Sequence, residues 1–115
     1  QIYLAPTADS REVWTSTLRH IALEGRFFVL SCNQYFTQSM YRPEHQALAP
    51  NEPEEMCPGG SVIISPLGEV IAGPLFGEAG ALTAELDLED IARAKLDFDV
   101  VGHYARRDIF SFSWK

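Results

Sequence analysis

The sequence predicts an α/β fold, and three local patterns support this prediction. An apolar run at residues 2–5, a helical pattern over Ser10–Glu24 and a second apolar run at Phe27–Cys32 follow one another directly. Strand, helix and strand in this order form a βαβ-type unit. Two further strand patterns between Ser61 and Ala72 are separated by a Pro-Leu-Gly turn, which is typical of a hairpin.

Composition limits the classes of function. The chain has 115 residues, 46% of them hydrophobic, which is enough apolar material for one folded core. Lys and Arg number 9 against 16 Asp and Glu, so the net charge is −7. An acidic chain is a poor binder of nucleic acid or of an anionic membrane surface, so we expect neither partner. No apolar run reaches the ~18 residues of a membrane-spanning helix.

The first helix has start and stop signals. Asp9 followed by Glu12 resembles a capping box, with Asp9 as the N-cap residue. Gly25 is suited to the position just after the helix. The apolar residues with helical spacing are Trp14, Leu18, Ile21 and Ala22. We therefore predict a helix over Ser10–Glu24 with one apolar face.

The segments on either side of residue 34 differ in character. Phe27–Cys32 is apolar at successive positions, which predicts a central strand covered on both faces. Residues 35–58 have no clear period and are rich in Pro and Glu, so we expect a long loop or insertion there. This insertion is either a solvated surface excursion or an assembly or lid element.

The second half of the chain begins with the hairpin and continues with weaker signals. Pro66–Gly68 forms its turn, and Gly73 and Pro74 are expected to end its second strand. Alternation over Ala81–Asp87 predicts a strand near the sheet edge, and Asp87 is placed to cap a helix over Leu88–Leu96.

No complete catalytic set is visible in the sequence. Cys32 lies at a strand end without an adjacent cation, and we interpret it as a small buried residue rather than a nucleophile. Cys57 lies in an acidic loop, which opposes ionisation of its thiol. Two cysteines are too few for a disulfide framework, so we expect Cys32 and Cys57 to be free thiols. We also expect a cytoplasmic location. The lysines, Lys95 and Lys115, have no dry pocket, and the scattered His and Cys residues predict no metal site.

Three long stretches of the chain carry a resemblance to a known family. They are IYLAPTADSREVWTSTLRHIALEGRFFVLSCNQ, GGSVIISPLGEVIAGPL and LDLEDIARAKLDFDVVGHYARRDIFSF. In this order they resemble the nitrilase branch of the carbon–nitrogen hydrolase superfamily. The resemblance implies a partial α-β-β-α sandwich, with residues 1–115 as the C-terminal portion of a single domain and an insertion at about 35–58.

The resemblance also implies an activity. Nitrilases convert a small-molecule nitrile to a carboxylic acid and ammonia through a Cys thioimidate and an acyl-enzyme, with Glu and Lys assisting and without a cofactor or metal. The family's Glu, Lys and Cys map upstream of the segment that matches residues 2–9, so none is expected in this chain. We therefore expect the isolated chain to be inactive. The alternative is a non-catalytic assembly or interaction module that uses the same fold.

Some supporting roles carry over from the resemblance. Thr7, Ala8 and Asp9 resemble a wall of the family's substrate pocket, and Asn33 and Gln34 end the next strand at the same sheet edge. These last two residues either line the pocket or cap the backbone of a loop. The Ser10–Glu24 helix resembles an element of the family's dimer interface, so a homo-oligomer is expected through it, although the helix also fits an ordinary core position.

Overall fold

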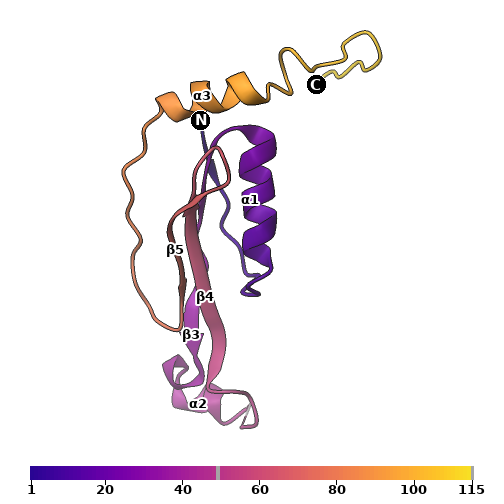
Figure 1. Ribbon diagram of the computed structural model, residues 1–115. Helices are drawn as coiled ribbons and strands as arrows, with labels where there is room; N and C mark the ends of the chain where they lie inside the picture. Colours follow the sequence, from indigo (N-terminus) through magenta and orange to yellow (C-terminus); the bar gives the residue numbers. More distant parts are fainter. Residues whose placement is uncertain (49, 115) are drawn as a thin grey trace.

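The fold is built on one mixed β-sheet with a helix on one face, as a computed structural model of the chain shows (Figure 1). The structure describes residues 1–48 and 50–114. The strands are β1 (Ile2–Leu4), β2 (Phe28–Ser31), β3 (Tyr35–Thr37), β4 (Glu55–Ile64) and β5 (Val70–Phe76). β1 pairs with β2 in parallel, whereas β2, β3 and β5 all pair with β4 in antiparallel fashion. The prediction of an α/β fold is confirmed.

The core lies between this sheet and helix α1 (Trp14–Gly25), which connects the two parallel strands. Leu18 and Ala22 of α1 are almost fully buried, against Val29, Val62 and Ile64 of the sheet. β2 is the predicted central strand, since it pairs with β1 on one side and β4 on the other and both Phe28 and Val29 are buried. The apolar helix spacing therefore predicted the correct face.

The two ends of α1 differ from the prediction. Asp9 does not cap the helix, because residues 12 and 13 form a turn and the first helical residue is Trp14. At the other end, Gly25 is still helical, and the left-handed residue is Arg26, with φ 49°. Its guanidinium bonds Asp97 (Nη2 to Oδ2, 2.7 Å) and lies over the Phe98 ring. These contacts favour Arg26 at a position where glycine is usual.

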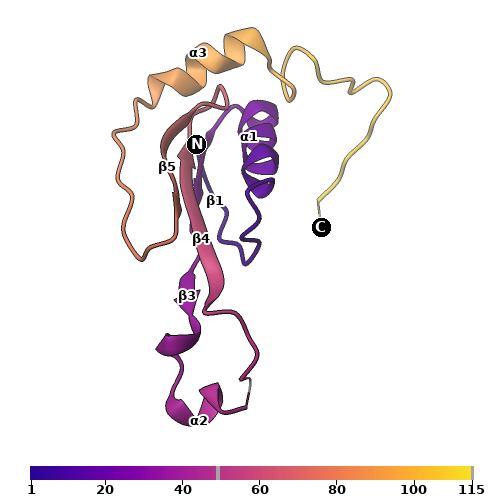
Figure 2. The same ribbon diagram turned by 60° about the horizontal axis from the view of Figure 1, so that its bottom comes forward.

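The expected insertion at 35–58 is a structured arm rather than a long loop. β3 pairs with the first residues of β4, and the connection carries a 3-10 helix, Gln38–Met40, and the short helix α2 (Pro43–Gln46). The arm projects from the end of the sheet away from the body (Figure 2), and the molecule is 60 Å long in that direction. An edge-to-face contact between Phe36 and Tyr41, with ring centroids 4.6 Å apart, holds the connection against β3.

The hairpin prediction is confirmed, but its strands are longer than expected. Gly68 has φ 77° in the turn, and its N–H donates to the Ser65 carbonyl at 2.9 Å. β5 continues past Gly73 and Pro74, because shifts of register against β4 accommodate both residues. Residues 81–87 do not form the predicted strand. They run beside the hairpin as a separate connection (Figure 1) and join no ladder within the described ranges.

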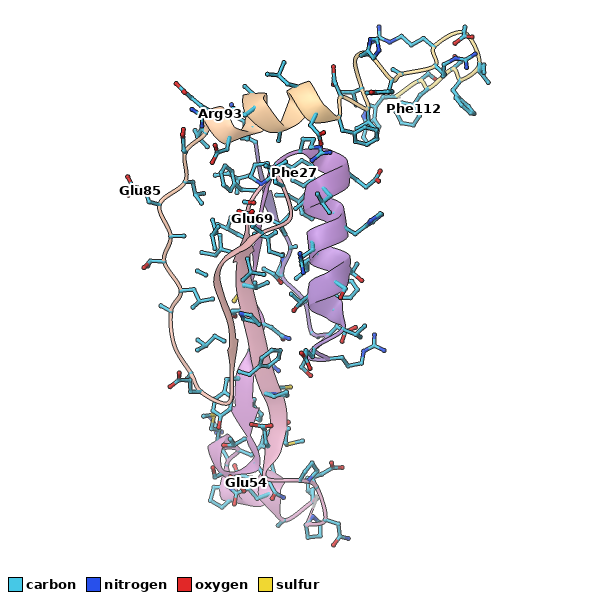
Figure 3. The ribbon with its side chains drawn as sticks, in the orientation of Figure 1. Phe27, Glu54, Glu69, Glu85, Arg93 and Phe112 are labelled. Atoms are coloured by element: carbon cyan, nitrogen blue, oxygen red, sulfur yellow. The ribbon has the colours of Figure 1, made fainter. Side chains whose placement is uncertain are left out.

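Helix α3 (Glu89–Asp97) lies across the end of the sheet, one residue later than predicted. The N-cap position is Leu88, which makes no side-chain cap, rather than the predicted Asp87; the Asp87 carboxylate, one residue earlier, accepts the Glu89 N–H at 3.0 Å. Arg93, labelled in Figure 3, reaches back to Asp87 and Glu89 from the same end of the helix. Residues 98–114 extend beyond α3 without a regular element. No helix in the described ranges is both long and apolar enough to cross a membrane.

Candidate substrate-facing site

The loop after β1 and the residues after β2 meet at one edge of the sheet, as predicted for Thr7, Asp9 and Asn33. The Thr7 N–H donates to the Cys32 carbonyl at 3.0 Å. The Asn33 side chain reaches across to the same loop, where its Nδ2 donates to the Asp9 carbonyl at 2.9 Å. Because β1 and β2 are parallel, their C-terminal ends necessarily lie side by side, which explains why sequence alone identified this neighbourhood.

Asn33 is a buried polar residue at this edge. It is 7% exposed, and its Nδ2 also donates to the Gly59 carbonyl at 2.8 Å. Its backbone N–H donates to Ser61 Oγ, and Ser61 Oγ donates to the Asn33 carbonyl. Asn33 therefore bonds loop backbone, one of the two roles that the sequence left open, and its place in a substrate pocket stays a prediction. Sequence reasoning missed Gly59 and Ser61 as partners, since no local signal identifies which strand lies opposite.

Asp9 and Arg11 form a local ion pair at the surface of the loop. Arg11 Nε donates to Asp9 Oδ1 at 2.9 Å, and the Arg11 backbone N–H donates to the same oxygen at 3.1 Å. These bonds to the Arg11 side chain and backbone lower the pKa of Asp9 to about 2. The carboxylate of Asp9 is thus kept ionised by Arg11, while its carbonyl is held by Asn33.

Gln34 and Ala8 are less tightly integrated. Both are exposed, and Gln34 Nε2 contacts Cys57 Sγ at 3.5 Å, directing it toward β4. The structure therefore brings Thr7, Asp9 and Asn33 into one bonded cluster, with Ala8 in the same loop and Gln34 at its margin. Whether these residues face a substrate stays a prediction.

Two cavities adjoin the cluster on the sheet face opposite α1. The larger, of about 510 Å³, is apolar and is lined by Leu4, Leu30 and Ile63 of three neighbouring strands. The smaller, of about 220 Å³, is lined by Asn33 and Gln34, with Glu78 from the connection after β5. Cys32 lines both cavities. Glu78 was not anticipated, because its approach depends on the path of the chain after β5.

The thiols and the lysine of the described part of the chain are separated. Cys32 is exposed rather than buried, contrary to expectation, because it follows the last residue of β2. Cys57 is half-buried, and both thiols are free, as expected. Lys95 lines a different cavity, beside the C-terminal end of α1. Lys115 lies outside the described residues. Within the described ranges, no group of three or more His, Cys, Asp and Glu side chains is placed to hold a metal ion.

Comparison with known proteins identifies the family. Residues 2–96 match the model of the carbon–nitrogen hydrolase family. The chain is 55% identical to an arylacetonitrilase of Trametes versicolor over 115 residues, covering 97% of this chain and 36% of the relative. It is 52% identical to an aliphatic nitrilase of Sinorhizobium fredii, covering 95% and 36%. A bifunctional nitrilase/nitrile hydratase of Nicotiana tabacum is 51% identical, with 96% and 34% covered.

The chain spans about a third of the length of these curated relatives. Its expected position as the C-terminal part of such a protein is not confirmed by these matches and stays a prediction. The family model nevertheless covers most of the chain, and it accounts for the α/β architecture described above. The chain belongs to the carbon–nitrogen hydrolase family.

Proposed function

We propose that this chain is part of a nitrilase, an enzyme that hydrolyses nitriles to carboxylic acids and ammonia, and that its catalytic Cys, Glu and Lys lie outside residues 1–115. The names and identities of the relatives support the reaction. The proposal that the catalytic residues lie outside this chain rests on the separation of its thiols from its described lysine, Lys95. Neither cavity that contains Cys32 is lined by a lysine among the described residues.

The reaction defines what this part of the protein would contribute. A thiolate adds to the nitrile carbon to give a thioimidate, one water releases ammonia to leave an acyl-enzyme, and a second water releases the acid and regenerates the thiol. This chain supplies no nucleophile in that scheme. Its contribution is a wall of the substrate pocket, formed by the loop at Thr7–Asp9 with Asn33 and Gln34 beside it.

The proposal includes assembly into a homo-oligomer through the helix predicted at Ser10–Glu24, and a cytoplasmic location. Val13 and Leu23 on and next to α1 are 64% and 38% exposed, and they supply apolar area outside the core. Free thiols at Cys32 and Cys57 fit a reducing compartment.

A chimera tests this function directly. Residues 1–115 replace the matching segment of the Trametes arylacetonitrilase, and ammonia release is measured with phenylacetonitrile. We expect the chimera to be active and the isolated chain to be inactive. The variants Cys32→Ser and Cys57→Ser should keep the chimera's activity, because neither thiol acts as the nucleophile.

Two results would contradict the proposal. Turnover by the isolated chain that is lost in Cys32→Ser would make Cys32 the nucleophile. A folded but inactive chimera would favour the alternative, a non-catalytic assembly module.

A further inference from the structure

We propose that Asn33 is a positioning residue, whose side-chain amide fixes the Thr7–Asp9 loop to β4 and thereby sets which nitriles the pocket accepts. The inference rests on the proposed function, since it treats this loop as a pocket wall. It differs from a binding role, because Asn33 acts through the loop rather than on the substrate.

The orientation of the amide is determined by its partners. Both atoms that face the Asn33 amide are backbone carbonyl oxygens, those of Asp9 and Gly59, at 2.9 and 2.8 Å. A carbonyl accepts hydrogen bonds and cannot donate them, so the atom between the two must be the NH2 group. Each of its hydrogens is used, one on the loop and one on β4. The side chain is therefore a bridge between two segments 50 positions apart in the sequence.

The base of this bridge is held firmly. The backbone of Asn33 exchanges two hydrogen bonds with Ser61 Oγ, at 3.0 and 3.1 Å, and the residue is 7% exposed. A side chain anchored in this way loses little further freedom when it bonds the loop. The Asn33 side chain thus holds the Thr7–Asp9 loop at a fixed position relative to β4.

The loop itself has few other attachments. Thr7 is tied to β2 by its N–H bond to the Cys32 carbonyl, and the Asp9 N–H turns back onto Thr7 Oγ1 at 2.9 Å. The Asp9 carboxylate bonds Arg11, which is exposed. Among the described hydrogen bonds, the one from Asn33 is therefore what ties Asp9 to another segment of the fold.

The two polar atoms of the Asn33 amide differ: Nδ2 donates two hydrogen bonds, whereas Oδ1 accepts none from the described residues. Asn33 Oδ1 is buried and has no hydrogen-bond partner among the described residues. The amide nitrogen supplies what a small apolar residue at this position would lack, a hydrogen bond to the Asp9 carbonyl of the loop.

The test uses Asn33→Asp in the active chimera. This change places a carboxylate oxygen against two carbonyl oxygens, so the bridge breaks and the loop is released. The measured quantity is the ratio of kcat/KM for phenylacetonitrile to kcat/KM for propionitrile. We expect the ratio to change by about tenfold, mainly through KM, because a misplaced wall affects substrates of different size unequally.

A ratio separates positioning from folding, since a lower folded fraction reduces both rates by the same factor. The matched control is Asn51→Asp, the same chemical change at an exposed residue of the arm, which should leave the ratio unchanged. Thr7→Val is the second variant. It keeps the side-chain volume but removes the acceptor of the Asp9 N–H, and it should shift the ratio in the same direction by a smaller factor.

The outcomes distinguish the two proposals. An inactive chimera before any substitution overturns the proposed function. An active chimera whose ratio is unchanged in both Asn33→Asp and Thr7→Val overturns the positioning role and leaves the proposed function intact. If Asn33→Asp does not fold, Asn33→Ser takes its place, because it also removes the amide that donates to the Asp9 and Gly59 carbonyls, and an unchanged ratio in that variant overturns the positioning role.

Discussion

Asp9 has two separate roles at the loop after β1. Its carbonyl accepts the Asn33 amide, while its carboxylate accepts the Arg11 backbone N–H and guanidinium. A short acidic side chain that bonds a backbone N–H two residues on is characteristic of an Asx turn. This turn occupies the residues that the sequence pattern assigned to the start of α1, and it displaces the helix start to Trp14.

The Arg11–Asp9 pair gives a pH prediction. The pKa of Asp9 is lowered from 3.8 to about 2, so its stabilising effect is present above the unfolded-state value and is lost as the pH falls through about 2. In Arg11→Gln the pKa should rise back toward 3.8. An NMR titration of the Asp9 carboxyl carbon checks this shift, with Asp108 as the internal reference because its partner, Arg106, is unchanged. An unaltered midpoint in Arg11→Gln would contradict the assignment.

Arg26 illustrates a limit of prediction from local signals. The general preference for glycine in a left-handed conformation selected Gly25 as the residue that follows the helix. The actual left-handed residue is Arg26, with its side chain 9% exposed between Asp97 and Phe98. These partners lie some seventy positions away, so no local pattern contains them.

At the scale of elements, the hydrophobic periodicity predicted what packs locally. The helical spacing of Leu18 and Ala22 and the two-sided apolar character of β2 both reflect burial, and both were confirmed. Alternation at 81–87 was present in the sequence but predicted a strand that does not form. A strand needs a partner ladder as well as a pattern, and this segment has none among the described residues.

The arm escaped prediction for a related reason. β3 is three residues long, and its ladder with β4 contains a register irregularity after Phe36. Its pairing partner follows after a long Pro- and Glu-rich connection, so neither length nor periodicity indicates a hairpin. The neighbourhood of the candidate site, in contrast, was predictable from the sequence. The parallel strands β1 and β2 place Thr7–Asp9 and Asn33 at the same end of the sheet, wherever the remaining strands lie.

The packing of α1 on the sheet predicts the effect of truncating a core side chain. Leu18→Ala should lower the free energy of unfolding by about 2–5 kcal/mol, since Leu18 is 1% exposed and its loss leaves a cavity. Leu96→Ala makes the same change on a helix residue that is 91% exposed, and its effect should be within about 0.5 kcal/mol. Urea unfolding of the dilute chain measures both values. Equal losses in the two variants would contradict the described core.

At the scale of the whole molecule, the sheet is covered unequally. Val29, Val62 and Ile64 face α1, whereas their neighbours Leu30 and Ile63 face the opposite side together with Leu4. On that side Leu4 is 69% exposed and Ile2 45% exposed. An apolar sheet face of this kind, beside the free edge of β1, favours association with other chains.

We therefore expect the purified chain to self-associate. Its mass by light scattering should rise with concentration, and Leu4→Lys should reduce that rise because it places a charge on the uncovered face. Leu48→Lys is the matched control, as Leu48 is 82% exposed but lies on the arm. A monomer at every concentration, or an equal effect of both variants, would contradict this expectation.

The length of β4 means that one strand connects the arm to the centre of the sheet. This single strand begins in the arm, next to Glu54 (Figure 3), passes Gly59 and ends between β2 and β5. The carbonyl that Asn33 holds, that of Gly59, therefore belongs to the same strand that pairs with β3 in the arm. The arm and the loop at Asp9 are therefore joined through β4 and the Asn33 amide, so a partner that binds the arm would contact the same strand that holds this loop.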